Sequence, residues 1–146
     1  MARRSVLLAV VVAATLAACS NDQPPQPAFE QVYTVRGIIS ELPTPDRPNL
    51  DLQIHHEAIP EFVNGAGEQV GMNAMTMPFP TLAQGVTLDG LEEGDKIRFT
   101  FGVVWEQGTA GRRFPHWTVT AIEELPAETE LTFSSPPEPQ PQPDSP

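Results

Sequence analysis

The sequence predicts an all-β domain, a small five-stranded antiparallel barrel of the OB type with disordered proline-rich tails. Three observations lead to this fold class. The 146 residues include 17 prolines, which exclude a long helical bundle. The middle of the chain consists of short runs in which apolar and polar residues alternate, as in half-buried strands. Clusters of Pro, Gly, Asp and Asn separate these runs, as expected for turns between strands. A β-sandwich stays open as the alternative arrangement.

Five runs carry the strand pattern, at residues 32–39, 50–54, 76–79, 96–105 and 114–123. The strict alternation of the second run places Leu50, Leu52 and Ile54 on its buried face. Helical candidates are single turns within 58–64 and 81–84. A barrel of this size can bury an adequate core, but it leaves no room for a large substrate pocket.

Two of the runs have a specific expected placement. The third run is cut by Pro78 and Pro80, which cannot donate to a sheet ladder, so it is expected at a sheet edge. The last run is expected to turn Trp117, Val119 and Ala121 to one face, because alternate residues of a strand share a side.

The chain divides into four segments. Residues 1–18 have the features of a lipoprotein signal peptide: two arginines, an aliphatic run too short to cross a bilayer, and the sequence Leu16-Ala17-Ala18-Cys19, which looks like a bacterial lipobox. Residues 19–30 are then the lipidated Cys19 and a flexible tether. Residues 31–126 form the barrel, and residues 127–146 are an acidic, proline-rich, disordered tail.

The amino terminus also indicates where the protein works. Cys19 would be lipidated, so we expect a protein anchored in the bacterial cell envelope and facing the periplasm. Ser20 stands where an inner-membrane retention signal usually has Asp, which favours the outer membrane over the inner one if the cell is Gram-negative.

Charge and cysteine content exclude several classes of function. The formal net charge is -11, which repels phosphate and argues against a nucleic-acid partner. The single cysteine leaves no internal disulfide and no multi-cysteine metal site. No Ser/His/Asp or Cys/His combination is visible, so we do not expect an enzyme. We expect a binding protein that is a monomer.

Soft metal ligands are concentrated in one short stretch. Met72, Met75 and Met77 are three of the four methionines in the chain, and the fourth is the initiator. Side chains two residues apart on a strand project together, with Cα atoms about 6.6 Å apart, so Met75 and Met77 can converge on one ion. Thioether sulfur is a soft neutral donor that selects Cu(I), and by extension Ag(I). The alternative is that these methionines only fill gaps in the core.

A histidine pair precedes the methionines. Imidazole is a suitable companion ligand that is mostly neutral at pH 7. His55 and His56 point to opposite faces of a continuing strand, so at most one of them can join the methionines. Glu57 is expected to be a solvated or capping carboxylate.

Three segments resemble the CusF-type periplasmic copper-binding proteins: Ile54 to Pro60, Met72 to Phe79, and Leu91 to Phe99. The resemblance runs from about Tyr33 to Leu125 and implies a five-stranded OB-like barrel that binds Cu(I) or Ag(I) and hands it to an efflux pump or another copper protein. It also implies that the histidine ligand is His56 and that the thioether ligands are Met75 and Met77.

The sequence departs from this family at one informative position. Best-known members have a metal-capping tryptophan three residues before the first thioether ligand, and this chain has Met72 there, which offers a third thioether. Trp117 could cap the metal from across the barrel, as could Trp105, although a core role is favoured for Trp117. The linker between His56 and Met75 is long and glycine-rich, and it is expected to form a flexible flap.

The resulting hypothesis is a lipid-anchored metallochaperone for copper efflux or tolerance. Three alternatives stay open: an OB-type module that binds a protein or carbohydrate, a copper storage or buffering protein, and an enzyme such as a copper oxidase fragment or a hydrolase.

Overall fold

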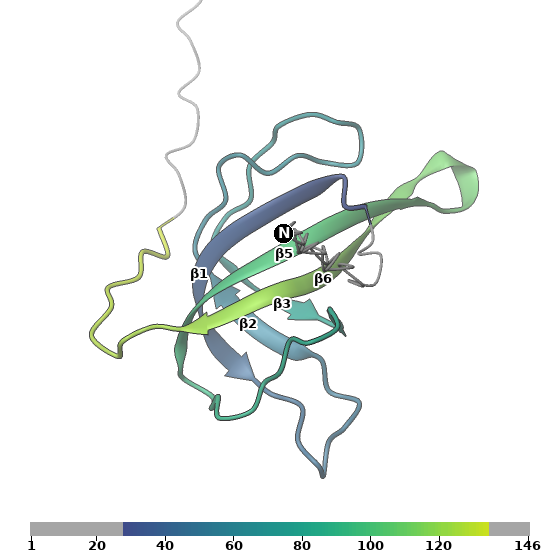
Figure 1. Ribbon diagram of the computed structural model, residues 1–146. Helices are drawn as coiled ribbons and strands as arrows, with labels where there is room; N and C mark the ends of the chain where they lie inside the picture. The colour runs from purple at the N-terminus through teal and green to yellow at the C-terminus, as the bar shows by residue number, and fades with distance from the viewer. Residues whose placement is uncertain (1–27, 135–146) are drawn as a thin grey trace, which may run out of the picture.

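Six β-strands form one curled sheet in the computed structural model, which describes residues 28–134 (Figure 1). In chain order they are β1 (Gln31–Glu41), β2 (Leu52–His56), β3 (Met75–Phe79), β4 (Thr81–Leu82), β5 (Lys96–Gln107) and β6 (Arg113–Glu124), and a short 3-10 turn spans Thr109–Gly111. The prediction of an all-β domain is confirmed. Neither of the expected helical turns is present, since residues 58–64 form bridges and turns and Thr81–Leu82 is β4.

The strand order in the sheet is β3-β2-β1-β5-β6-β4. The strands at its two ends, β3 and β4, are consecutive in the chain and are separated only by Pro80. β4 pairs in parallel with β6, whereas the other neighbours pair antiparallel. The sheet therefore closes on itself as an OB-like barrel and not as a sandwich.

The sixth strand, β4, directly follows the predicted third strand and lies where a helical turn was expected. Pro80 has no N–H to give to a ladder, so pairing stops there, and the chain changes partner from β2 on one side to β6 on the other. As Pro78 and Pro80 predict, β3 lies at an end of the strand order.

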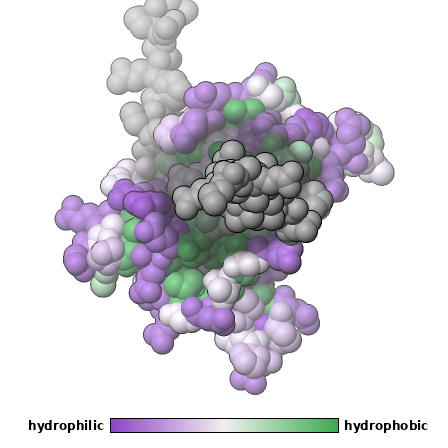
Figure 2. Space-filling model, in the orientation of Figure 1, coloured by the Kyte–Doolittle hydropathy of each residue, from purple (hydrophilic) through white to green (hydrophobic). Residues whose placement is uncertain are grey.

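The barrel interior is filled by apolar side chains from alternate positions of β1, β2, β3 and β5. Phe79, Phe99 and Phe101 pack at its centre, with ring centroids 5.1 to 5.7 Å apart. Leu52 and Ile54 are buried, as their alternation predicts. On the face seen in Figure 2, hydrophobic side chains are visible in groups among hydrophilic ones.

A bulge corrects the predicted face of β6. Thr100 pairs with Ala121, but the next residue, Phe101, pairs with Val119, so Thr120 is an extra residue on β6. The alternation therefore changes phase. Trp117 and Val119 turn inward as expected, whereas Ala121 is exposed and Ile122 packs against the core in its place.

Ordered contacts extend beyond the predicted barrel limits of 31 and 126. Glu30 donates its N–H to the Val103 carbonyl, and residues 127–134 lie against the barrel. The predicted disordered tail thus does not begin at residue 127. The segments predicted to be a signal peptide and a lipobox with Cys19, and the proline-rich stretch from residue 135, lie outside the described residues.

Candidate metal centre

The pairing of β2 with β3 determines which side chains share a face. In this register His56 lies opposite Met75, Ile54 opposite Met77, and His55 opposite Thr76. Directly opposed residues of an antiparallel pair project to the same side. His56, Met75 and Met77 therefore lie on the inner face, whereas His55 and Thr76 lie on the outer face. The two histidines point apart, as the strand pattern predicts.

His56 and Met77 are in direct contact inside the barrel. The His56 Nε2 atom lies 3.2 Å from the Met77 Sδ atom. His56 is fully buried and is the one buried polar residue among residues 28–134. Met77 is also buried, but Met75, at the beginning of β3, is 45% exposed. The site therefore has a closed inner side and an open rim.

A hydrogen bond from the other ring nitrogen fixes the tautomer of His56. Nδ1 lies 2.6 Å from the Glu57 carbonyl oxygen, which can only accept a hydrogen bond. Nδ1 must therefore carry the proton, and in the neutral ring Nε2 is left with a free lone pair. Burial lowers the pKa of His56; the hydrogen bond to Glu57 opposes this shift, and the nearby His55 reinforces it. The ring is thus held in its neutral form, with Nε2 aimed at a sulfur atom.

This arrangement fits a soft metal ion. The unprotonated Nε2 and the thioether Sδ are both lone-pair donors, so neither can donate a hydrogen bond to the other. His56 Nε2 and Met77 Sδ lie 3.2 Å apart, so both atoms are close enough to bind one ion.

Met72 packs against the core next to its bridge with Ile59. Its backbone exchanges two hydrogen bonds with Ile59, at 2.8 and 2.9 Å, which continues the register of β2 and β3 beyond His56 and Met75. Regular alternation from Met75 would turn Met72 outward. The ladder is interrupted between the two pairs, however, and Ile59 is buried while Met72 packs against the core. Met72 thus packs against the core, and the direct contact of His56 is with Met77.

The linker between the strands is not the flexible flap that its glycines suggested. Ile59 and Phe62 are buried, and the Val63 N–H donates to the Tyr33 hydroxyl over 2.9 Å. The Phe62 carbonyl accepts hydrogen bonds from Val70 and Gly71. Two apolar anchors therefore fasten the linker to the barrel, and counting glycines could not reveal them.

The two tryptophans pack in an aromatic cluster around Phe62. Ring centroids of Trp105 and Trp117 lie 6.4 and 6.1 Å from that of Phe62, and Trp117 also packs on Phe101. The Trp105 indole N–H donates to Gln31. These contacts assign both rings to packing, in agreement with the core role favoured for Trp117.

Glu57 is not the solvated carboxylate that the sequence suggested. Its side chain is 13% exposed and forms a two-pronged ion pair with Arg36, with both N–O distances 2.8 Å. Arg36 lies on β1, 21 residues away, so no local sequence signal links the two residues.

Comparison with known proteins gives a family match. A family model described as "Copper binding periplasmic protein CusF" matches residues 33–109, just over half of the chain. The chain belongs to the CusF family. The match includes most of β1, all of β2 to β5 and every residue of the candidate site, whereas β6 and residues 125–134 lie beyond it. No significant match was found among curated proteins or solved structures.

Two further observations concern the described part of this CusF-family chain. Residues 28–134 contain no group of three or more His, Cys, Asp or Glu side chains placed to hold a metal ion. Within the same residues, no helix has the length and apolarity to cross a membrane.

Proposed function

We propose that this protein binds Cu(I), and Ag(I) as a second soft ion, through His56, Met75, Met77 and Met72, and that it acts as a metallochaperone in copper efflux or tolerance. The observation that carries the proposal is the 3.2 Å approach of an unprotonated His56 Nε2 to Met77 Sδ. The family match supports copper as the metal.

The ligand set accounts for the choice of metal. Thioethers are neutral and soft, so they stabilise monovalent copper over hard cations. Zinc prefers thiolates or several imidazoles, and this group of residues has one imidazole and no thiolate.

The same ligand set suits transfer. Met77 and His56 hold the ion from the buried side, while the exposed Met75 leaves it open to a ligand from another protein. Exchange through this open side would let copper pass to a soft-ligand partner, such as an efflux pump, without unfolding of the barrel.

The proposed cellular setting follows from the amino terminus. Lipidation at Cys19 would hold a monomeric barrel at the envelope membrane on a short tether, facing the periplasm. The acidic surface would attract cations and keep the protein soluble beside the membrane.

Storage or buffering of copper is the second candidate, because it uses the same site. Measured transfer of copper to an efflux component, faster than the spontaneous loss of copper to solution, would separate the two roles. A module that binds a protein or carbohydrate would need none of these ligands.

The test of the site is Cu(I) competition against a chromogenic chelator under reducing conditions. Met77→Leu and Met75→Leu keep nearly the same side-chain volume, so the fold is retained while a sulfur is lost. We expect each to weaken Cu(I) binding at least tenfold, and Met72→Leu to weaken it by a smaller factor.

A matched control is Leu82→Met, which alters a partly buried position on β4 and leaves the site intact. Its Cu(I) affinity is expected to stay at the wild-type value. Unchanged affinity in both Met75→Leu and Met77→Leu would refute the proposed site.

A further inference from the structure

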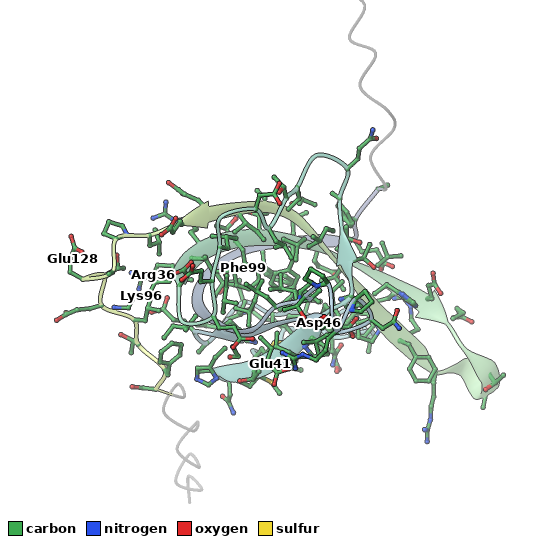
Figure 3. The ribbon with its side chains drawn as sticks, turned by 90° about the horizontal axis from the view of Figure 1, so that it is seen from below. Arg36, Glu41, Asp46, Lys96, Phe99 and Glu128 are labelled. Carbon is green, nitrogen blue, oxygen red and sulfur yellow. The ribbon has the colours of Figure 1, made fainter. Side chains whose placement is uncertain are left out.

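The chain turns back across the outside of the barrel after β6. We call residues 127–134 the C-terminal strap. Lys96, at the start of β5, donates through Nζ to the carbonyls of Ala127 and Thr129. Inward and outward positions then alternate along the strap, with Thr129, Leu131 and Phe133 partly buried. Arg36 and Lys96 lie on the side along which the segment carrying Glu128 runs (Figure 3).

The strap ends on the two neighbours of His56. The Thr132 N–H donates to Glu57 Oε1 over 2.7 Å. The Phe133 ring packs on the His55 ring, with centroids 4.4 Å apart. His55 is further held by Thr76, whose hydroxyl lies 3.0 Å from its Nδ1. The residues before and after the candidate ligand are therefore both contacted by a segment about 75 residues further along the chain.

Glu57 connects the strap to the His56 ring. β2 ends at His56, so the position of Glu57 is not fixed by pairing with β3. It is fixed by its N–H, which donates to the Arg36 carbonyl, and by its carboxylate, which accepts from Arg36 and from Thr132. The carbonyl of this same residue accepts the hydrogen bond of His56 Nδ1.

We propose that the C-terminal strap is a positioning element for His56: by holding Glu57 through Thr132 and His55 through Phe133, it keeps the Glu57 carbonyl at Nδ1 and leaves Nε2 unprotonated toward Met77. The family match ends at residue 109, so the strap lies outside the part of the chain that the family model describes. The inference rests on the proposed copper site for its effect on affinity.

The physical consequence concerns the two neutral forms of the ring. Without a fixed acceptor at Nδ1, the proton can move to Nε2, where it blocks the lone pair that a metal needs. Residues that orient a ligating histidine typically contribute 10 to 100-fold to metal affinity. Because the strap acts through Glu57 and not directly, we expect an effect of about tenfold.

The experiment uses the full chain with two pairs of variants. Thr132→Pro removes the N–H that Glu57 accepts, and Thr132→Ala keeps it. Phe133→Ala removes the ring on His55, and Phe114→Ala removes an exposed ring on the distant β5–β6 hairpin. The His56 tautomer is read without metal from long-range ¹H–¹⁵N correlation spectra, and Cu(I) dissociation constants are read by chelator competition.

Wild type, Thr132→Ala and Phe114→Ala should show the Nδ1–H tautomer and equal affinity. Thr132→Pro and Phe133→Ala should show a mixture containing Nε2–H and a dissociation constant raised about tenfold. An unchanged tautomer in both variants, or a changed tautomer with affinity within twofold of wild type, would overturn the proposal. If wild type bound no Cu(I), the proposed function would fail, and the tautomer would still decide whether the strap positions His56.

Discussion

At the residue scale, the defining feature is a neutral imidazole buried beside a thioether. A fully buried histidine normally needs partners for both ring nitrogens. Here Nδ1 has the Glu57 carbonyl, but Nε2 faces only Met77 Sδ, a weak acceptor. The Nε2 lone pair therefore lacks a strong hydrogen-bond partner, which lowers the stability of the metal-free protein. A bound soft ion would remove this penalty. Copper should therefore stabilise the protein, by an amount that grows with the logarithm of the free copper concentration divided by the dissociation constant.

The lowered pKa of His56 predicts a pH dependence of stability. Burial lowers its pKa in the fold below the ordinary value of about 6.5, so the unfolded chain binds more protons at mildly acidic pH. This contribution to the free energy of unfolding is complete above about pH 6.5 and is lost as the pH falls through the folded pKa. Cu(I) affinity should stay level near neutrality and decline over the same acidic range, since the proton competes for Nε2.

Urea unfolding at pH 7.5, 6.5 and 5.5 checks this prediction, with chelator competition at the same pH values. His56→Gln should flatten the pH dependence of stability, whereas His55→Gln, on the outer face, should leave it in place. An apo protein that became more stable between pH 7.5 and 5.5 would contradict the assignment to His56.

At the element scale, the close approach of β1 and β2 places the candidate ligand. Gly37 pairs with His56, and a Cβ atom added at Gly37 would lie 2.7 Å from the His55 carbonyl oxygen and 2.8 Å from Ile54 Cγ2. Both separations are shorter than real contacts allow. Only glycine lets the two strands come this close beside the site, although its φ angle is ordinary.

Gly37→Ala should accordingly affect both the fold and the site. Overpacking of this kind costs about 1 to 3 kcal/mol, and a shift of β2 would move His56 away from Met77. Urea denaturation and Cu(I) competition should both show a loss. Ser40→Ala, on the same strand, adds no atoms and should change neither quantity by much. A Gly37→Ala protein with wild-type Cu(I) affinity would show that the spacing of β1 and β2 does not position His56.

At the scale of the whole molecule, the aromatic cluster and the metal centre are separate parts of the barrel. Trp105 and Trp117 pack around Phe62, near the end of β1 that carries Gln31, whereas His56 pairs with Gly37, six residues along the strand. At about 3.3 Å per residue, Gln31 lies roughly 20 Å from Gly37 along β1, and Tyr33, which packs on Phe62, lies roughly 13 Å from it. One region can therefore contribute stability while the other exchanges metal.

This separation predicts that Trp117→Phe alters stability and not metal binding. Loss of aromatic contacts should cost on the order of 1 kcal/mol in urea denaturation. The Cu(I) dissociation constant should stay within about twofold of wild type. A tenfold weaker affinity in a folded Trp117→Phe protein would mean that this ring caps the metal after all.

The local pattern of the sequence predicted much of the fold and part of the candidate site. Alternation of apolar and polar residues identified the strands and the opposite directions of His55 and His56, because side-chain direction along a strand depends only on neighbouring residues. It failed at Ala121, where a bulge changes the phase.

What the sequence determined by itself is therefore the chemistry: a soft, neutral group of thioethers beside one imidazole, on strands of a small barrel. Their role as ligands stays a prediction until copper binding is measured. Only the tertiary structure decided the register that sets His56 opposite Met75, the Arg36–Glu57 ion pair and the docking of the strap. These features join segments about 20 to 75 residues apart in the sequence. Their contacts form only when the whole barrel closes, so no local sequence pattern reveals them.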